Sequence, residues 1–453
     1  MTECSQWQFE FEAHFSRRVV AEFSGERLSI EGGALLLRAT DHKIGLLRRV
    51  VRCFTDGRDP ERIEHELSEM LAQRIYGLAL GYEDLNDHEE LRRDPLLAAL
   101  AGKREVQEPL AGKSTLNRME LAPANSTGTG RYHKISYSAE AIDELLVNIF
   151  LEAHRKPPRE IVLDLDATDT PLHGRQEGRF FHGYYGHYCY LPLYIFSGDH
   201  LLCARLRPSN QDASAGSREE VERIVRQIRT RWPKVRILLR ADSGFCREEL
   251  MVWCENHGVD YVFGFARNRR LRRLIGRAMH EAQQEHQRTG KPARAFTEFF
   301  YRTKKSWSRA RRIVAKAEQI TGKENPRYVV TSLGNDAWPA QKLYEQLYCA
   351  RGEMENRIKE QLSLFSDRLS TETLRANQLR LYFSSLAYVL LDALRRIGLR
   401  GTEWATAQVE TIRLRLLKIA AQVRVTVRRI WVRYSSAYPW KNLFAAVWSA
   451  LRC

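Results

Sequence analysis

Three carboxylates that lie far apart in the chain have surroundings suited to metal-dependent chemistry. Asp166 ends the apolar stretch 161–166, Asp242 follows the apolar stretch 235–241, and Glu355 lies in a helix-like segment. The first two follow predicted strands, and open α/β sheets place their sites at the carboxyl ends of strands. Three convergent carboxylates suit Mg²⁺, a hard ion that prefers oxygen ligands. A pair of such ions activates an attacking water or hydroxyl and neutralises a leaving oxyanion, as cleavage of a phosphodiester requires.

Glu355 belongs to a segment, residues 338–362, whose spacing predicts a helix. The apolar stripe of this helix consists of Leu343, Leu347, Ala350, Met354 and Ile358. The polar stripe beside it consists of Tyr348, Arg351, Glu355 and Lys359. Because the polar stripe borders the buried one, we expect Glu355 to face a cleft, flanked by cations. Gly352 costs such a helix about 1 kcal/mol relative to alanine, which is understandable if another group approaches the backbone closely.

Each carboxylate also has a purely structural interpretation. Asp164 and Asp166 share one face of their strand, and this strand end could simply turn into a polar loop. Asp242 could cap the turn or helix that follows it. A single Glu on a helix, such as Glu355, is most often solvated surface. A shared site is favoured because a buried strand tolerates two carboxylates only beside a cation or strong hydrogen bonds.

The composition indicates a polyanionic partner. The 453 residues suffice for two or three domains, and 72 Lys and Arg against 56 Asp and Glu leave a formal net charge of +16. Such an excess is typical of nucleic-acid-binding proteins. The sequence predicts neither a transmembrane helix nor a signal peptide, so we expect no membrane partner. The eight cysteines lack a C-x-x-C pair, which favours free thiols in the cytoplasm.

Strand and helix patterns alternate in the middle of the chain and predict an α/β fold. An antiparallel meander is expected from strands at 161–166, 180–196 and 201–207. After a helix at 217–232, a right-handed βαβ unit is expected from segments 235–241, 247–257 and 259–265. A very basic stretch and three more strands interrupt this rhythm before the Glu355 helix; the strands are expected at 296–301, 311–317 and 327–332.

This order of elements resembles the ribonuclease-H-like fold of DDE transposases. The spacing Tyr348-x-x-Arg351-x-x-x-Glu355 is similar to the Tyr-Arg-Glu-Lys signature of bacterial insertion-sequence transposases. Asp166-Ala-Thr168 is like the Asp-x-Thr of that family's first motif, which favours Asp166 over Asp164 and Asp169. The segments Phe181-His-Gly-Tyr-Tyr-Gly-His-Tyr and Arg240-Ala-Asp-Ser-Gly-Phe add to the likeness.

The chain departs from the signature at one position. The signature Lys falls seven residues after the Glu, where this chain has Leu362. Lys359 lies one helical turn after Glu355 and is the expected substitute. The departure concerns the Lys, and the three carboxylates keep the family's pattern.

The resemblance implies a DNA transposase that holds two Mg²⁺ ions, with Mn²⁺ as an alternative, on Asp166, Asp242 and Glu355. It implies cleavage at the ends of a mobile element, then attack of the freed 3′-hydroxyl on target DNA. The implied partners are double-stranded DNA, as terminal inverted repeats and target, and a second copy of the chain on the paired ends. The implied location is the bacterial cytoplasm, at the nucleoid. Two alternatives stay open: a metal-dependent nuclease without strand transfer, and a non-catalytic DNA-binding protein.

Five segments are expected on this basis. They are a helical N-terminal region that binds DNA ends (1–155), the first part of a ribonuclease-H-like catalytic domain (156–266), a β-rich insertion (267–336), the continued catalytic domain with its Glu helix (337–372), and a helical C-terminal region for DNA binding or dimerisation (373–453).

The insertion carries a cationic segment with an aromatic residue, Trp307. We expect Lys304, Lys305 and Arg309 to contact DNA phosphates, as we expect of Tyr348, Arg351 and Lys359 on the helix. Trp307 would stack on an unpaired base. The alternative is that Trp307 packs in a small β core.

Overall fold

The structure, a computed structural model, describes residues 8–23, 27–122 and 134–452. The chain forms two compact units, each assembled from separate stretches. One unit consists of Met1–Val51, Arg58–Arg118 and Ala393–Cys453, and the other of Arg52–Gly57 and Met119–Asp392. Every candidate site residue belongs to the second unit. Within the described ranges, no helix is long and apolar enough to span a membrane.

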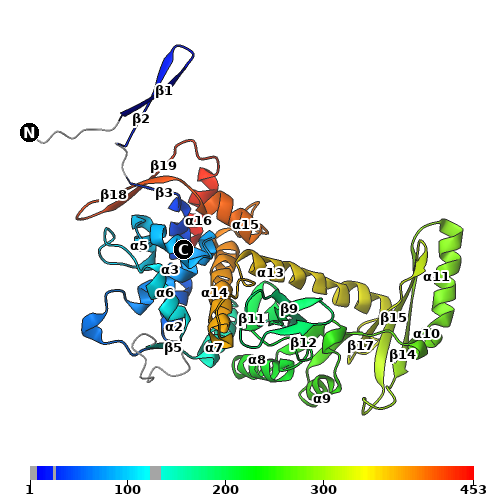
Figure 1. The fold of residues 1–453 in the computed structure, drawn as a ribbon. Coiled ribbons are helices and arrows are strands. Elements are labelled where there is room, and N and C mark those ends of the chain that lie inside the picture. Colours follow the sequence, from blue (N-terminus) through cyan, green and yellow to red (C-terminus); the bar gives the residue numbers. More distant parts are fainter. Residues whose placement is uncertain (1–7, 24–26, 123–133, 453) are drawn as a thin grey trace, which may run out of the picture. The chain divides into compact units, whose positions relative to one another are not determined.

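One large mixed sheet organises the second unit (Figure 1). Its strands, in spatial order, are β11 (His200–Arg205), β10 (Leu193–Ser197), β6 (Glu160–Ala167), β12 (Arg236–Ala241), β13 (Asp260–Phe265), β17 (Arg327–Thr331), β15 (Arg311–Ile320) and β14 (Ala293–Tyr301), with β16 (Lys323–Glu324) pairing at the end of β15. Strands β11, β10 and β6 pair antiparallel, whereas β6, β12 and β13 run parallel. An antiparallel meander joined to a parallel βαβ unit is the ribonuclease-H-like arrangement, so the predicted fold class is confirmed.

The second strand of the meander begins later than the sequence predicts. Residues 180–190 do not enter the large sheet. They form a small sheet in which β9 (His187–Tyr190) pairs with both β7 (Thr170–Pro171) and β8 (Phe180–His182). A tight turn closes this hairpin at Gly186, whose φ of +75° suits glycine. The first part of the predicted strand 180–196 is therefore β-structure, but it belongs to a separate hairpin.

The two faces of the sheet have different neighbours because side chains alternate along each strand. Ile237 and Leu239 of β12 share a core with α7 (Ala139–Glu152), α8 (Ser217–Arg231) and α9 (Glu248–Asn256). Leu238, between them, packs on the opposite face with Leu343 and Leu347 of the Glu355 segment. The Glu355 segment therefore covers the face that α8 and α9 leave open (Figure 1).

The predicted insertion extends this same sheet. Strands β17, β15 and β14 continue it beyond β13, all antiparallel, close to the three predicted positions. Two helices in the basic stretch were not predicted: α10 (Arg269–Leu274) and α11 (Gly276–Thr289). The start of α10 is capped by Asn268, whose side chain accepts a hydrogen bond from the Leu271 N–H at 2.9 Å.

The Glu355 segment is helical but irregular. It begins as α12 (Ala340–Lys342), widens into a π-helical turn over Leu343–Tyr348, tightens over Cys349–Arg351 and continues as α13 (Gly352–Ser363). The predicted apolar stripe is largely confirmed, since Leu343, Leu347, Met354 and Ile358 are buried. A π-helical turn inside a helix is frequent at functional sites, and here it includes Tyr348.

The first unit combines both ends of the chain. It contains the helices α1 (Leu35–Ile44), α2 (Leu46–Val51), α3 (Leu67–Leu80), α5 (Pro95–Ala101), α15 (Val409–Ile412) and α16 (Lys441–Arg452). The flanks predicted as helical also contain strands, namely the hairpin β1 (Gln8–His14) with β2 (Arg17–Glu22) and the sheet of β19 (Ile430–Tyr434), β18 (Ala421–Val425) and β3 (Leu28–Ser29). Buried Glu31 accepts hydrogen bonds from Tyr82 and Lys418, both at 2.6 Å, so residues about 390 positions apart hold this unit together.

Candidate functional site

Two parallel strands place Asp166 and Asp242 at the same edge of the sheet. Asp166 is the penultimate residue of β6, and Asp242 directly follows β12. The register pairs Leu165 of β6 with Ala241 of β12, so the two Asp residues leave neighbouring strands side by side. One oxygen of Asp242 accepts a hydrogen bond from the Gly244 N–H at 2.8 Å and thereby caps the following turn. The capping role and a place in the site are therefore compatible.

A single guanidinium links Asp166 to Glu355. Arg351 donates from Nη1 to Asp166 Oδ2 at 2.8 Å and from Nη2 to Glu355 Oε1 at 3.2 Å. The side chains of Arg351 and Asp166 are 18% and 17% exposed, whereas that of Glu355 is 55% exposed. The structure thus brings residues from β6 and α13, 189 positions apart, around one cation at the sheet edge.

Tyr348 completes this group from the π-helical turn. Its hydroxyl lies so close to Gly264 of β13 that a Cβ added there would come within 2.6 Å of the tyrosine oxygen and 2.9 Å of the Ser243 nitrogen. Only glycine leaves room for Tyr348 beside the turn that begins at Asp242. Burial, opposed by Arg351 and reinforced by Asp242, raises the pKa of Tyr348, so the hydroxyl stays protonated at neutral pH.

Asp164 has a different role from Asp166, although both point to the same face of β6. Its carboxylate receives two hydrogen bonds from Arg240 of β12, at 2.5 and 2.8 Å, and both side chains are under 10% exposed. Arg240 also donates to the Leu347 carbonyl oxygen at 2.7 Å. This buried pair links β6 and β12 to the Glu355 segment. It thereby helps to position Asp166, Arg351 and Glu355.

The electrostatics of the group favour added positive charge. Burial is the main reason why the pKa of Asp166 rises from 3.8 to about 6; the nearby Asp242 carboxylate adds to the rise, and Arg351 opposes it. Burial alone would lower the pKa of Arg351, but Asp166, Tyr348, Asp242 and Glu355 outweigh it and raise the pKa. Three ionised carboxylates and one guanidinium sum to −3 + 1 = −2.

The residues present fit a hard divalent cation, because they offer carboxylate oxygens and together carry a net charge of −2. Within the part of the chain that the structure describes, no three Asp, Glu, His or Cys side chains are close enough to hold a metal ion as they stand. The Arg351 guanidinium lies between Asp166 and Glu355, so it stands in for a cation there. Cation binding between these two residues therefore requires Arg351 to swing aside.

The remaining predicted DNA contacts differ in accessibility. Lys304, Lys305 and Lys359 are exposed. Arg309 is held in an ion pair with Glu255. Leu362, at the position of the signature Lys, is half-buried on α13. All of these residues belong to the second unit.

Trp307 is buried, which supports the alternative of a core tryptophan over base stacking. The indole is 5% exposed and belongs to the main core, 5.0 Å from the ring of Phe265 and 6.0 Å from that of Tyr301. Trp307 lies on the connection between β14 and β15. Its large apolar ring is more stable packed in the core than exposed to water. The alternative, a core tryptophan, is what the structure shows.

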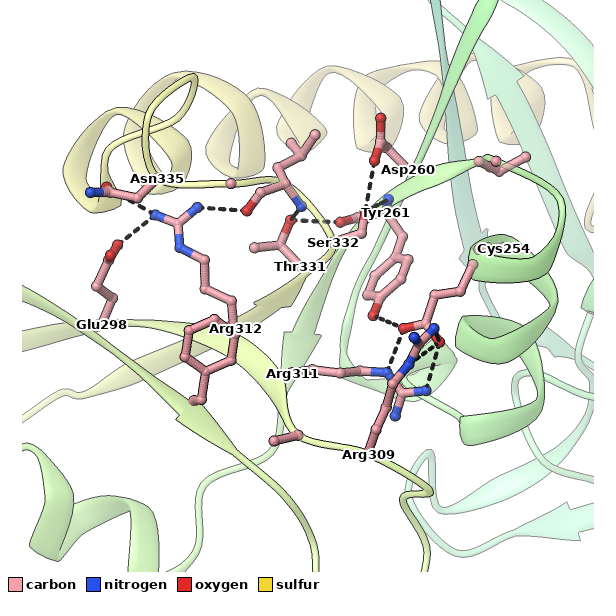
Figure 2. Close-up of a pocket in the computed structure, with 17 residues that line it drawn as sticks. Cys254, Asp260, Tyr261, Glu298, Arg309, Arg311, Arg312, Thr331, Ser332 and Asn335 are labelled. Atoms are coloured by element: carbon pink, nitrogen blue, oxygen red, sulfur yellow. Dashed lines mark hydrogen bonds and ion pairs between the residues drawn. The ribbon is translucent and has the colours of Figure 1, made fainter.

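A second arginine group was missed by the sequence analysis. Arg311, at the start of β15, donates to Glu248 at 2.6 Å and to Glu255 at 2.7 Å, and Tyr261 donates to Glu255 at 2.8 Å. Figure 2 shows Arg309 and Arg311 converging beside the Tyr261 hydroxyl, at the wall of a pocket of about 580 Å³. The available signal was the spacing of Glu248 and Glu255, two turns apart on one face of α9.

Arg312, next to Arg311 in β15, points to the opposite face of the sheet. It binds the connection that precedes the Glu355 segment. It donates to Glu298 at 2.5 Å and to the Leu333 carbonyl oxygen at 2.8 Å (Figure 2). It also donates to the Trp338 carbonyl oxygen at 2.8 Å. These bonds tie β15 and β14 to the connection that leads into α12. The extended sheet is therefore a support for the helix that carries Glu355.

The sheet order and the carboxylate group at its edge define the class: a ribonuclease-H-like α/β protein with an acidic site between strand ends and a helix. The chain matches the family described as transposase DDE domain group 1 over residues 11–453, and it belongs to that family. It is therefore a DDE transposase, an enzyme of the polynucleotidyl transferase class.

Two further comparisons complete this picture. Among solved structures, the piggyBac transposase in a synaptic complex with hairpin DNA aligns with 85% of this chain and 80% of its own, at 10% sequence identity and a TM-score of 0.42. No curated protein sequence is significantly similar to this chain.

Proposed function

We propose that this DDE transposase cleaves phosphodiester bonds at the ends of an insertion sequence and joins the freed 3′-hydroxyl to target DNA, in cut-and-paste transposition. Asp166, Asp242 and Glu355 are its catalytic and metal-binding residues. The observation that carries the proposal is that Asp166 and Glu355 share Arg351, while Asp242 follows the adjacent strand end beside Asp166.

Two divalent ions, Mg²⁺ or Mn²⁺, supply Lewis-acid neutralisation of the reacting oxygens and a more acidic attacking water or hydroxyl when bound. Asp166 and Asp242 would hold them from adjacent strand ends, and Glu355 from the helix. The more exposed Glu355 is the carboxylate best able to adjust its position to the ions. The buried Asp164–Arg240 pair would hold β6, β12 and the Glu355 segment in fixed positions when the ions bind.

Arg351, Lys359 and Tyr348 are the proposed contacts to DNA beside the carboxylates. A phosphate oxygen offers Arg351 an alternative to its present carboxylate partners, and guanidinium–phosphate pairs are strong and directional. Lys304 and Lys305 would hold the duplex backbone from the exposed connection between β14 and β15. The net charge of +16 supports binding along an extended polyanion.

The partners we propose are the terminal inverted repeats of the element, target DNA and a second copy of the chain. Two element ends must be cut and joined together, and a pair of identical active sites matches that symmetry. A DNA substrate of this kind places the protein at the bacterial nucleoid.

A strand-transfer assay tests this function. The purified chain and Mg²⁺ are mixed with labelled DNA fragments that flank its coding region, together with a target plasmid. Cleavage followed by joining supports transposition, and cleavage without joining supports the nuclease alternative. If Asp242→Asn and wild type bind DNA alike and neither cuts it, the protein is a non-catalytic DNA-binding member of its family.

A further inference from the structure

An aromatic surface follows directly on the first carboxylate motif and has no role in the site described above. In the β8–β9 hairpin, Phe181 and Tyr188 lie directly opposite each other, with ring centroids 5.6 Å apart. Phe181 is 58% exposed, Tyr188 43%, and Tyr184 in the turn 87%. Three large aromatic side chains on one short hairpin are costly to leave in water, which indicates a ligand surface.

The hairpin has a fixed base below this exposed tip. The second half of β9 is buried, with Cys189 and Tyr190 at 0% exposure. The Tyr190 hydroxyl donates to the Glu177 carbonyl oxygen at 2.6 Å and accepts from Asn377 at 3.2 Å. The Ser209 hydroxyl donates to the Phe180 carbonyl oxygen at 2.9 Å. The aromatic rings are thus presented by a rigid support, which lowers the entropic cost of binding.

The chain connections place this hairpin beside the first carboxylate motif. Residues 170–190 leave the large sheet just after Asp166 and return to it at Leu193, which pairs with Ala167 of β6. Within the hairpin, His187 lies 2.7 Å from Asp169, three residues after Asp166. The hairpin therefore lies next to the first carboxylate motif. Its His187 face is turned toward Asp169, and Phe181 and Tyr188 lie on the opposite face.

The chemistry of the surface matches a nucleobase and its phosphate. The guanidinium of Arg179 lies 3.8 Å from the centre of the Tyr188 ring, so positive charge borders the aromatic faces. Arg175 is exposed in the preceding loop. Aromatic rings bordered by arginine are the combination that binds unpaired bases irrespective of sequence, because every base has a π face. A protein partner with an apolar face would not need the arginines.

We propose that Phe181, Tyr184 and Tyr188 form a platform that stacks unpaired nucleotides at the DNA end whose phosphate lies in the carboxylate site. This inference rests on the proposed function and adds the substrate form to it: a DNA end that is frayed, rather than fully paired, next to the reacting phosphate. The platform assumes the role that the sequence analysis assigned to Trp307, whose ring is buried.

Equilibrium binding to two DNA ends tests the platform. One duplex is fully paired, and the other has a few unpaired nucleotides at its end, including a fluorescent adenine analogue. Wild type should bind the unpaired end more tightly and change the fluorescence of the analogue. The double variant Phe181→Ala/Tyr184→Ala should lose at least about tenfold in affinity for the unpaired end and bind the paired duplex as before. Both side chains are mostly exposed, so the variant should keep the wild-type melting temperature.

Phe300→Ala is the matched control, because Phe300 is 76% exposed on β14, at the other end of the sheet. It should bind both ends like wild type. Equal affinity of the double variant and wild type for the unpaired end would overturn the platform. So would a change of oligomeric state in the double variant without any change in base binding, since the surface would then contact a second copy. Failure of the proposed function would show separately, as absence of cleavage by wild type on either end.

Discussion

Two arginines of the same unit, Arg311 and Arg351, each lie between carboxylates, but their surroundings differ in charge. Arg311 and Arg309 face Glu248 and Glu255, which sums to +2 − 2 = 0. Arg351 contacts Asp166 and Glu355, and the nearby Asp242 carboxylate also raises its pKa; these four charges sum to +1 − 3 = −2. The first group is neutral as it stands, whereas the second has an excess of negative charge. This difference separates a structural ion-pair cluster from a candidate active site.

The pKa values follow this difference. Burial would raise the pKa of Glu255, but hydrogen bonds from Arg311, Arg309 and Tyr261 outweigh it and lower the pKa to about 2. At Asp166, burial dominates and the pKa rises to about 6. One carboxylate is thus stabilised in its charged form by the fold, and the other is kept charged at neutral pH against the preference of its surroundings.

The largest expected effect comes from Glu355→Gln. Loss of one carboxylate removes part of the charge that would hold the ions, which contribute several kcal/mol to transition-state stabilisation. DNA cleavage in the presence of Mg²⁺ should fall by roughly 10³-fold. The melting temperature should not fall, because Glu355 is more than half exposed. Near-normal cleavage would remove Glu355 from the proposed site.

The same substitution in the other group, Glu255→Gln, should have the opposite outcome. It leaves buried Arg311 with one carboxylate partner, and breaking a buried ion pair typically costs about 3 kcal/mol. Urea unfolding should show this loss of stability, while cleavage per folded molecule stays near wild type. Unchanged stability would mean that Glu248 alone suffices for Arg311.

In the presence of a metal chelator, the contributions of Asp166 and Glu255 to stability should depend on pH with opposite signs. The folded pKa of Asp166, about 6, exceeds its ordinary 3.8, so its contribution is fully present below about pH 4 and is lost as the pH rises through 6. That loss is at most about 3 kcal/mol. Asp166→Asn should abolish it and be more stable than wild type at pH 7.

The contribution of Glu255 has the reverse dependence. Its folded pKa of about 2 lies below the ordinary 4.5, so stability is present above about pH 4.5 and is lost as the pH falls toward 2. Urea unfolding of wild type, Asp166→Asn and Glu255→Gln across this range separates the two contributions. Identical pH profiles for wild type and Asp166→Asn would contradict the charge deficit at Arg351.

The smallest expected effect is stabilisation by Mg²⁺ in the absence of DNA. Metal at roughly ten times its Kd should stabilise the chelator-treated protein by about 1–2 kcal/mol, because it binds the folded state. Calorimetric melting should show this shift in wild type and in Glu255→Gln. Asp242→Asn should show none. An equal shift in all three proteins would place the bound Mg²⁺ elsewhere.

Local patterns in the sequence predicted much of the fold and the candidate residues. Apolar stretches identified β6 and β12, and with them the strand ends that carry Asp166 and Asp242; alternation put Asp164 and Asp166 on one face. Helical spacing identified both stripes of the Glu355 segment. These predictions succeed because side-chain direction repeats every 2 residues in a strand and every 3.6 in a helix, which backbone geometry alone determines.

Long-range pairing decided the rest. Strand alternation does not distinguish Asp164, which Arg240 neutralises, from Asp166, which shares Arg351 with Glu355; only the Asp-x-Thr resemblance favoured Asp166. Nor does the sequence reveal that β17, β15 and β14 join the main sheet, that Trp307 is buried, or that Arg311 meets two glutamates of α9. The sequence by itself determined which residues are able to do chemistry, because residue type and spacing are local properties. Only the tertiary structure decided which carboxylates are already neutralised and which leave an excess of negative charge, because charge balance depends on neighbours that the chain brings in from far away.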